Sequence, residues 1–147
     1  MVHARIEQRD ERDALVKASR RSFTGVLFWL VSLIAFGVAS RRLGGLPEWI
    51  TLYAGDVAWG AMFFVLFCAV RPTLSTARAW LAAVLMTELI EFSELWHSPW
   101  LDALRATRAG GFLLGHVFLW SDVVCVALGA TLAAGAERAW RDRARAP

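Results

Sequence analysis

Apolar residues dominate four long stretches of the chain, and short polar segments separate these stretches. The first runs from Phe23 to Ser40 and holds 18 residues without a formal charge. The others run from about Trp49 to Val70, about Ala77 to Trp96 and about Gly111 to Ala136. An α-helix needs roughly 20 mostly apolar residues to cross the hydrocarbon core of a bilayer. The pattern therefore predicts an all-α protein, an integral membrane bundle of four transmembrane helices.

The two ends of the chain are charged, whereas its middle is apolar. This predicts an N-terminal cytoplasmic arm over residues 1–21, a four-helix membrane domain over 22–137 and a basic cytoplasmic tail over 138–147. Hydrophobic residues make up 57% of the chain and charged residues 20%, with a mean hydropathy of +0.46. These values are too apolar for an ordinary soluble domain, so that class of protein is excluded.

Lysine and arginine are divided unevenly between the predicted connections. Of the 16, 12 lie in the N-terminal segment, the second connection and the C-terminal tail. Positive charge is retained on the cytoplasmic side, so both termini are expected there. A net charge of +3 and a pI near 9.5 fit contact with anionic lipid. Membrane lipid is the expected partner, nucleic acid is not, and a homo-oligomer or a membrane complex is left open.

Carboxylates interrupt three of the four apolar stretches. Glu88, Glu91 and Glu94 lie on the third predicted helix, Asp56 lies on the second and Asp122 on the fourth. A charged side chain inside a bilayer costs roughly 3 kcal/mol on insertion scales. Such acids must therefore be protonated, paired, hydrated or bound to something. We expect the three helices to turn them inward into one enclosed site in the outer half of the membrane, with Asp122 near the midplane.

Helical spacing supports this inward orientation. One face of the second predicted helix carries Asp56, Trp59, Gly60, Phe63 and Phe67. On the fourth, Gly115, Asp122 and Gly129 follow a seven-residue spacing, and Gly111 with Gly115 forms a GxxxG pair that permits close helix approach. His116 falls in the same layer, either as a site residue or as a hydrogen-bonded core histidine. For the acids, the alternative to a functional site is polar contact that only joins helices.

The connection between the third and fourth predicted helices contains Pro99 and three charged residues at three-residue intervals, Asp102, Arg105 and Arg108. This spacing favours a short amphipathic helix on the outer surface. Such a helix could aim Arg105 at the buried acids, or at an anionic ligand above them. A solvated loop with ordinary interfacial arginines is the alternative.

Several catalytic and metal-binding chemistries are disfavoured by spacing. Glu94 and His97 match half of a di-iron carboxylate motif, but no second copy exists. The segment before Asp56 lacks the first glycine of the GxGD motif of intramembrane aspartyl proteases, and GxSxG, HExxH and P-loop motifs are absent. No metal or cofactor is expected, and no reaction is assigned. Cys68 and Cys125 lack CxxC spacing and are expected to be packing residues rather than a disulfide.

Four groups of residues carry a family resemblance: Gly55-Asp56 with Trp59; Glu91 to Leu95; Pro99 to Asp102 with Arg105; and Gly115 with Phe118 to Asp122 and Gly129. Over about residues 21–137 the chain resembles small bacterial four-helix membrane proteins of the domain of unknown function 2809 family. That family usually has glutamine where this chain has Glu94, and an aromatic residue where it has Val126.

A fainter likeness is to VanZ-like envelope proteins, which pair an acid-x-x-glutamine helix with an arginine and then Asp-x3-Asn-x2-Gly. Here Glu91, Glu94, Arg105 and Asp122 follow that frame, but Val126 replaces the asparagine. The resemblances imply a role in the bacterial envelope, in the cytoplasmic (inner) membrane. They supply no reaction.

The leading hypothesis is an outer-leaflet cavity that binds a polar ligand such as a lipid head group. The candidate ligand-binding residues are Asp56, Trp59, Glu88, Glu91, Glu94, Asp102, Arg105, His116, Trp120 and Asp122. A proton- or cation-coupled transporter and a structural subunit of a membrane complex are the alternatives. A membrane hydrolase that uses the acids as general acid and base ranks last.

Overall fold

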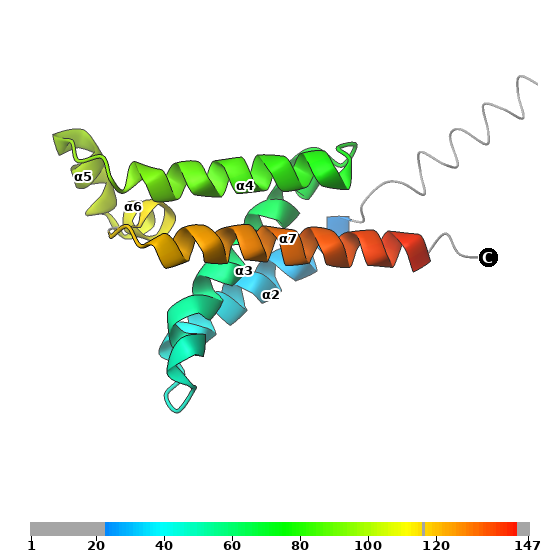
Figure 1. The fold of residues 1–147 in the computed structure, drawn as a ribbon, viewed down its shortest axis with the longest axis horizontal. Helices are drawn as coiled ribbons and strands as arrows, with labels where there is room; N and C mark the ends of the chain where they lie inside the picture. The colour runs from blue at the N-terminus through cyan, green and yellow to red at the C-terminus, as the bar shows by residue number, and fades with distance from the viewer. Residues whose placement is uncertain (1–22, 116, 144–147) are drawn as a thin grey trace, which may run out of the picture.

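A computed structural model describes residues 23–115 and 117–143 (Figure 1). Within these ranges all regular secondary structure is helical. The helices are α2 (Phe23–Arg42), α3 (Glu48–Val70), α4 (Thr76–Ser93), α5 (Pro99–Arg105), α6 (Arg108–Leu114) and α7 (Trp120–Arg143). The predicted N-terminal arm, His116 and the last four residues lie outside the described residues. The all-α prediction is confirmed, and the expected interfacial segment contains two short helices, α5 and α6.

The prediction for the fourth apolar stretch is wrong at its start. Instead of one helix from Gly111, the chain forms α6, turns at Gly115 and begins α7 at Trp120. Gly115 has a φ of +61°, a left-handed conformation that interrupts a right-handed helix. Gly115 and Asp122 therefore do not share a helix. At the other end, α7 continues through the predicted basic tail as far as Arg143.

Three helices are long and apolar enough to cross a membrane: Thr24–Arg42 of α2, Glu48–Val70 of α3 and Trp120–Arg143 of α7. The expectation of spanning helices is thus supported for these three. The predicted third span became α4, which has 18 residues and includes Arg78, Glu88 and Glu91. With three charged residues over that length, α4 is not among the helices that are long and apolar enough to cross a membrane.

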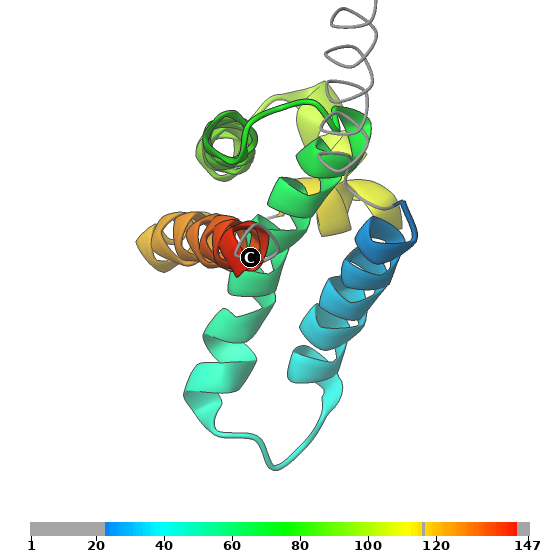
Figure 2. The same ribbon diagram turned by 90° about the vertical axis from the view of Figure 1, so that its right-hand side faces the viewer.

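The central helix is α3, which packs against α2, α4 and α7. Figure 2 shows α4 and α7 end-on, on one side of α3, with α2 on the other side. In Figure 1, α4 and α7 run side by side in opposite directions, and α5 and α6 lie near one end of this pair. Among the described helices α2 packs only against α3. The arrangement is therefore an α2–α3 hairpin crossing an α4–α7 pair.

Small residues allow α3 and α7 to approach closely where they cross. A Cβ atom on Gly60 of α3 would collide with the carbonyl oxygen of Val126, and one on Gly129 of α7 would collide with the carbonyl oxygen of Val57. Close backbone approach through small residues is the usual way in which membrane helices gain van der Waals contact. Close helix approach was expected at Gly111 and Gly115, but the structure shows it at Gly129 against α3.

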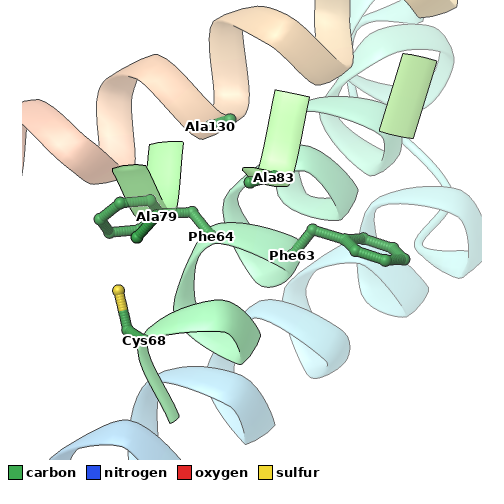
Figure 3. Close-up of a cluster of buried hydrophobic side chains, with 6 residues drawn as sticks. All are labelled: Phe63, Phe64, Cys68, Ala79, Ala83 and Ala130. Carbon is green, nitrogen blue, oxygen red and sulfur yellow. The ribbon is translucent and has the colours of Figure 1, made fainter. Parts of the chain in front are cut away.

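An apolar core joins α3, α4 and α7 (Figure 3). We call this set the apolar core: Phe63, Phe64 and Cys68 of α3, Ala79 and Ala83 of α4, and Ala130 of α7. Beside it, the indole nitrogen of Trp80 donates a hydrogen bond of 3.0 Å to the Thr131 hydroxyl, which links α4 to α7. Cys68 and Cys125 are not bonded to each other, as predicted.

Large apolar side chains cover the outside of the helices. Phe28 is 63% exposed on α2, Leu89 is 67% exposed on α4 and Val124 is 66% exposed on α7. Soluble monomers rarely expose continuous apolar surface of this kind. These surfaces are suited to contact with lipid.

Candidate functional site

A cavity of about 430 Å³ lies between α2, α3, α4, α6 and the first turn of α7. Five of the predicted site residues line it: Asp56, Trp59, Glu91, Glu94 and Asp122. We call this space the acidic cavity. The structure thus brings carboxylates from three separate helices to one place, although they are far apart in the sequence. Its volume lies in the range of small-molecule sites.

Glu91 is a buried acid of the cavity wall whose carboxylate has no hydrogen-bond partner within the described residues. Its residue is 7% exposed, and it continues the buried face of α4 that includes Ala83 and Thr87, four residues apart. Glu91 lines the acidic cavity, and within the described residues its carboxylate forms no hydrogen bond or ion pair. A buried carboxylate without a hydrogen-bond partner is costly, so this group favours a ligand or water in the cavity.

Glu94 is 6% exposed and lies against Gly115. A Cβ atom at position 115 would occupy the place of the Glu94 carboxylate oxygen Oε1. Position 115 therefore needs glycine for two reasons: its φ is positive, and a side chain there would overlap the Glu94 carboxylate. This contact holds the end of α4 and the turn after α6 together at the cavity wall.

Asp56 forms an ion pair with Arg41, and the distance from Arg41 Nη2 to Asp56 Oδ1 is 2.6 Å. The Arg41 side chain crosses over Gly55, where a Cβ atom would meet its guanidinium group. Arg41 and Arg42 both line the acidic cavity. In the sequence they are two of the four Lys and Arg residues expected on the outer side. The sequence signal for the cavity contact was their position at the end of α2. Side chains there point back toward the N-terminus of their own helix, and so lie beside the next helix of a hairpin rather than in the connection.

Asp122 lies in the first turn of α7 and accepts a hydrogen bond of 3.1 Å from the Ser121 hydroxyl. The continuous helix from Gly111, from which the depth of Asp122 near the membrane midplane was predicted, does not form, since α7 starts at Trp120. Acidic groups are stabilised near the N-terminal end of a helix by its dipole. Asp122 therefore reaches the cavity from a helix end and not from mid-helix.

Arg105 does not line the acidic cavity. It is 4% exposed and donates hydrogen bonds to the backbone oxygen of Trp96 at 3.0 Å and of Ser93 at 2.5 Å. The last carbonyls of a helix lack partners within it, and Arg105 satisfies them at the end of α4. Asp102 lies 3.5 Å from Arg105 Nη1 and 3.3 Å from His97 Nδ1. Arg105 was expected to face the buried acids or an anionic ligand above them. In the structure it instead caps the end of α4.

The remaining predicted residues lie elsewhere. Glu88 does not line the cavity, and its Oε2 atom is buried without a hydrogen bond within the described residues. Trp120 is 70% exposed and packs against Phe118, with ring centroids 5.1 Å apart. Asp102 lies on α5, away from the cavity lining, and His116 is outside the described residues.

Aromatic rings form part of the cavity wall. Trp59 packs edge-on against Phe112 at 5.4 Å and against Phe63 of the apolar core at 5.1 Å. An indole face beside several carboxylates attracts a cation by both charge and quadrupole. Among residues 23–115 and 117–143, no group of three or more His, Cys, Asp and Glu side chains is arranged to hold a metal ion. Four acids and two arginines line the cavity, so it presents carboxylate hydrogen-bond acceptors beside two cationic groups.

Comparison with solved structures finds no match to this chain. The family model described as "Protein of unknown function (DUF2809)" matches residues 45–130, more than half of the chain. The matched range contains all four cavity carboxylates, whereas Arg41 and Arg42 precede it. Of the two resemblances noted from the sequence, the one to this family is confirmed, and the chain belongs to the DUF2809 family of proteins of unknown function.

Proposed function

We propose that this chain is a multi-pass protein of a bacterial cytoplasmic membrane that binds a polar ligand, such as a lipid head group, in the acidic cavity. In this proposal α2, α3, α4 and α7 span the bilayer, α5 and α6 lie at the outer interface, and both termini are cytoplasmic. The acids accept hydrogen bonds from the ligand, and Arg41 holds Asp56 in place.

The position of α4 supports its role as a fourth span. It lies beside α7 and turns Leu85 and Leu89 outward, with exposures of 61% and 67%. Of its three charges, Arg78 is in the first turn and Glu91 faces the cavity rather than the outside. The helix can therefore present an apolar face to lipid despite its acids.

The observation that best supports the proposal is the burial of the Glu91 carboxylate at the cavity wall. The residue is 7% exposed and lines a cavity of about 430 Å³, and its carboxylate has no hydrogen bond within the described part of the chain. Intramembrane acids are expensive and usually mark functional sites. A ligand that donates hydrogen bonds would offset this cost.

The apolar core favours binding over transport. It fills the contact of α3, α4 and α7 beyond the acidic cavity, where Phe63, Phe64 and Ala130 are 7%, 2% and 0% exposed. A transported ion would have to cross this packed region, and opening it would require the helices to separate. Binding at one side needs no such change.

Native mass spectrometry of the full chain, gently extracted from a membrane, tests the binding. We expect the wild type to retain a non-protein mass and Glu91→Gln to lose most of it. Glu48→Gln is the matched control, because Glu48 is exposed at the start of α3 and does not line the cavity. Equal retention by the wild type and Glu91→Gln would contradict the proposal.

The side of the membrane that holds the C-terminus tests the fourth span. With four spans, the end of α7 and the α3–α4 connection lie on the same, cytoplasmic side. With three spans they lie on opposite sides. A reporter fused after residue 147 and a single accessible cysteine at Thr73 distinguish these cases, and opposite sides would exclude α4 as a span.

A further inference from the structure

The side of the cavity formed by α2 is closed only loosely. Leu33, Ile34 and Val38 of α2 line the cavity, yet α2 packs against α3 and against no other described helix. The facing wall comes from Phe112 and Leu113 of α6. No helix packing seals the space between these two walls.

The edges of this gap are apolar and exposed. Ile34 is 45% exposed and Val38 38% on α2, while Phe112 is 58% and Leu113 48% on α6. In a bilayer these side chains meet hydrocarbon, because α2 is long and apolar enough to span it. The acidic cavity therefore communicates sideways with lipid chains.

The cavity-lining residues of α2 change from apolar to positively charged along the helix. Leu33, Ile34 and Val38 are apolar, and the same stripe ends in Arg41 and Arg42. From Leu33 to Arg42 the rise is about 13 Å at 1.5 Å per residue. Arg41 is paired with Asp56, whereas Arg42 is exposed and forms no ion pair within the described residues. Arg42 is thus available for an anionic group at the rim.

Three chemical zones follow one another around the cavity. The interior holds Glu91 without a partner, Asp122 and the Trp59 ring, which suit an ammonium group that donates hydrogen bonds. The rim holds Arg42, which suits a phosphate. The side gap is apolar and suits acyl chains. A phospholipid whose head group carries an ammonium beyond its phosphate has the same order of groups.

We infer that the ligand of the acidic cavity is an aminophospholipid that enters from the bilayer between α2 and α6. Its ammonium group lies among Glu91, Asp56 and Asp122, its phosphate contacts Arg42, and its chains lie along Leu33, Ile34 and Val38. This inference rests on the proposed function and names the ligand class for that same cavity. A quaternary ammonium group cannot donate the hydrogen bond that Glu91 lacks, so a primary ammonium is specified.

The test is native mass spectrometry of the full-length wild type, titrated with dioleoyl phosphatidylethanolamine, phosphatidylcholine or phosphatidylglycerol. We expect the ethanolamine lipid to bind with 1:1 stoichiometry and about tenfold more tightly than the other two, the effect of about one charge-assisted hydrogen bond. Equal affinity for phosphatidylcholine or phosphatidylglycerol would overturn the inference. Displacement of the lipid by an equal concentration of chainless phosphoethanolamine would also overturn it.

Matched variants locate the lipid. Arg42→Gln should weaken binding of the ethanolamine lipid about tenfold, and Arg71→Gln, at the far end of α3, should not. Val38→Trp should fill the side gap and reduce binding, whereas Val31→Trp, seven residues earlier on α2 and outside the cavity lining, should leave it unchanged. No difference within either pair would contradict this placement.

The two proposals fail in different ways. If Glu91→Gln retains as much bound ligand as the wild type, the acidic cavity is not the binding site and both proposals fail. If Glu91→Gln loses a ligand that is not an aminophospholipid, binding in the cavity stands and only the inference about its ligand fails.

Discussion

At one end of their contact, α3, α4 and α7 are joined by the apolar core, whereas toward the other end the same helices direct Asp56, Glu91 and Asp122 at a cavity. The core residues are between 0% and 7% exposed and consist of alanine, phenylalanine and cysteine. Glu91, at 7%, is buried to the same degree but has no partner within the described residues. The apolar core and Glu91 are therefore equally buried, although one is apolar and the other is an acid.

This difference suggests that one region of these helices stabilises the fold and the other binds the ligand. At the core, small residues and one hydrogen bond from Trp80 to Thr131 keep the helices together. At the acidic cavity, the carboxylates bring electrostatic cost and no packing gain. Residues of the core and of the helix ends should thus control folding, while cavity residues should control ligand affinity. The following variants are ordered by their expected effect on stability.

Gly60→Leu should have the largest effect. A side chain at this position collides with the Val126 carbonyl and forces α3 away from α7, so the free energy of unfolding should fall by about 3 kcal/mol or more. Thermal denaturation in detergent measures the loss. The control is Gly135→Leu on α7, where a Cβ atom meets nothing within 4 Å. Similar melting temperatures for the two variants would disprove the close crossing.

Arg105→Ala should lower the free energy of unfolding by about 2 kcal/mol, because two charge-assisted hydrogen bonds to the end of α4 are lost. Lipid affinity at a temperature where the variant is folded should not change. Arg108→Ala provides the comparison, since Arg108 is exposed at the start of α6. Lost lipid affinity without lost stability would instead assign Arg105 to the ligand site.

Trp80→Phe should cost about 1 kcal/mol, the scale of one hydrogen bond between membrane helices. The ring can still pack beside the apolar core. Unfolding in mixed micelles compares it with Trp140→Phe, whose side chain is on a residue 67% exposed. An equal, negligible change in both would show that the α4–α7 hydrogen bond does not contribute to the stability of the core.

Glu91→Gln should change the free energy of unfolding least, by no more than about 0.5 kcal/mol of loss, and a gain is compatible with the account. The amide is cheaper to bury than a carboxylate, and no hydrogen bond within the described residues is broken. Denaturation without added lipid is the appropriate measurement. A loss comparable to that of Arg105→Ala would mean that Glu91 is a structural contact.

Hydrophobic pattern predicted the long helices because the free energy of burial sums over about 20 residues and tolerates small errors at the ends. α2 and α3 begin and end within two residues of the predicted limits. The segment after Gly111 was mispredicted because one positive φ at Gly115 outweighs a continuous apolar sequence. Such a local conformation is not visible in hydropathy.

Residues of the site could be predicted only where a charged side chain lies in an apolar helix, because burying that charge in lipid costs free energy. Asp56, Glu91 and Asp122 stood out as acids in apolar helices, and the structure places all three at one cavity. The contacts of Arg41 and Arg105 could not be predicted because both are arginines near helix ends, where solvation, capping and ion pairing give the same sequence signal. Their partners, Asp56 and the carbonyls of α4, follow only from tertiary geometry.

The most direct test of the contrast between a dry core and an accessible acidic cavity uses two thiols in one molecule. In the double variant Asp122→Cys/Cys125→Ala, position 122 lies on the cavity wall and Cys68 lies in the apolar core, 3% exposed. A positively charged, water-soluble methanethiosulfonate should modify position 122 and leave Cys68 unmodified, as peptide mass mapping would show. Equal modification of both thiols, or of Cys68 first, would contradict the account.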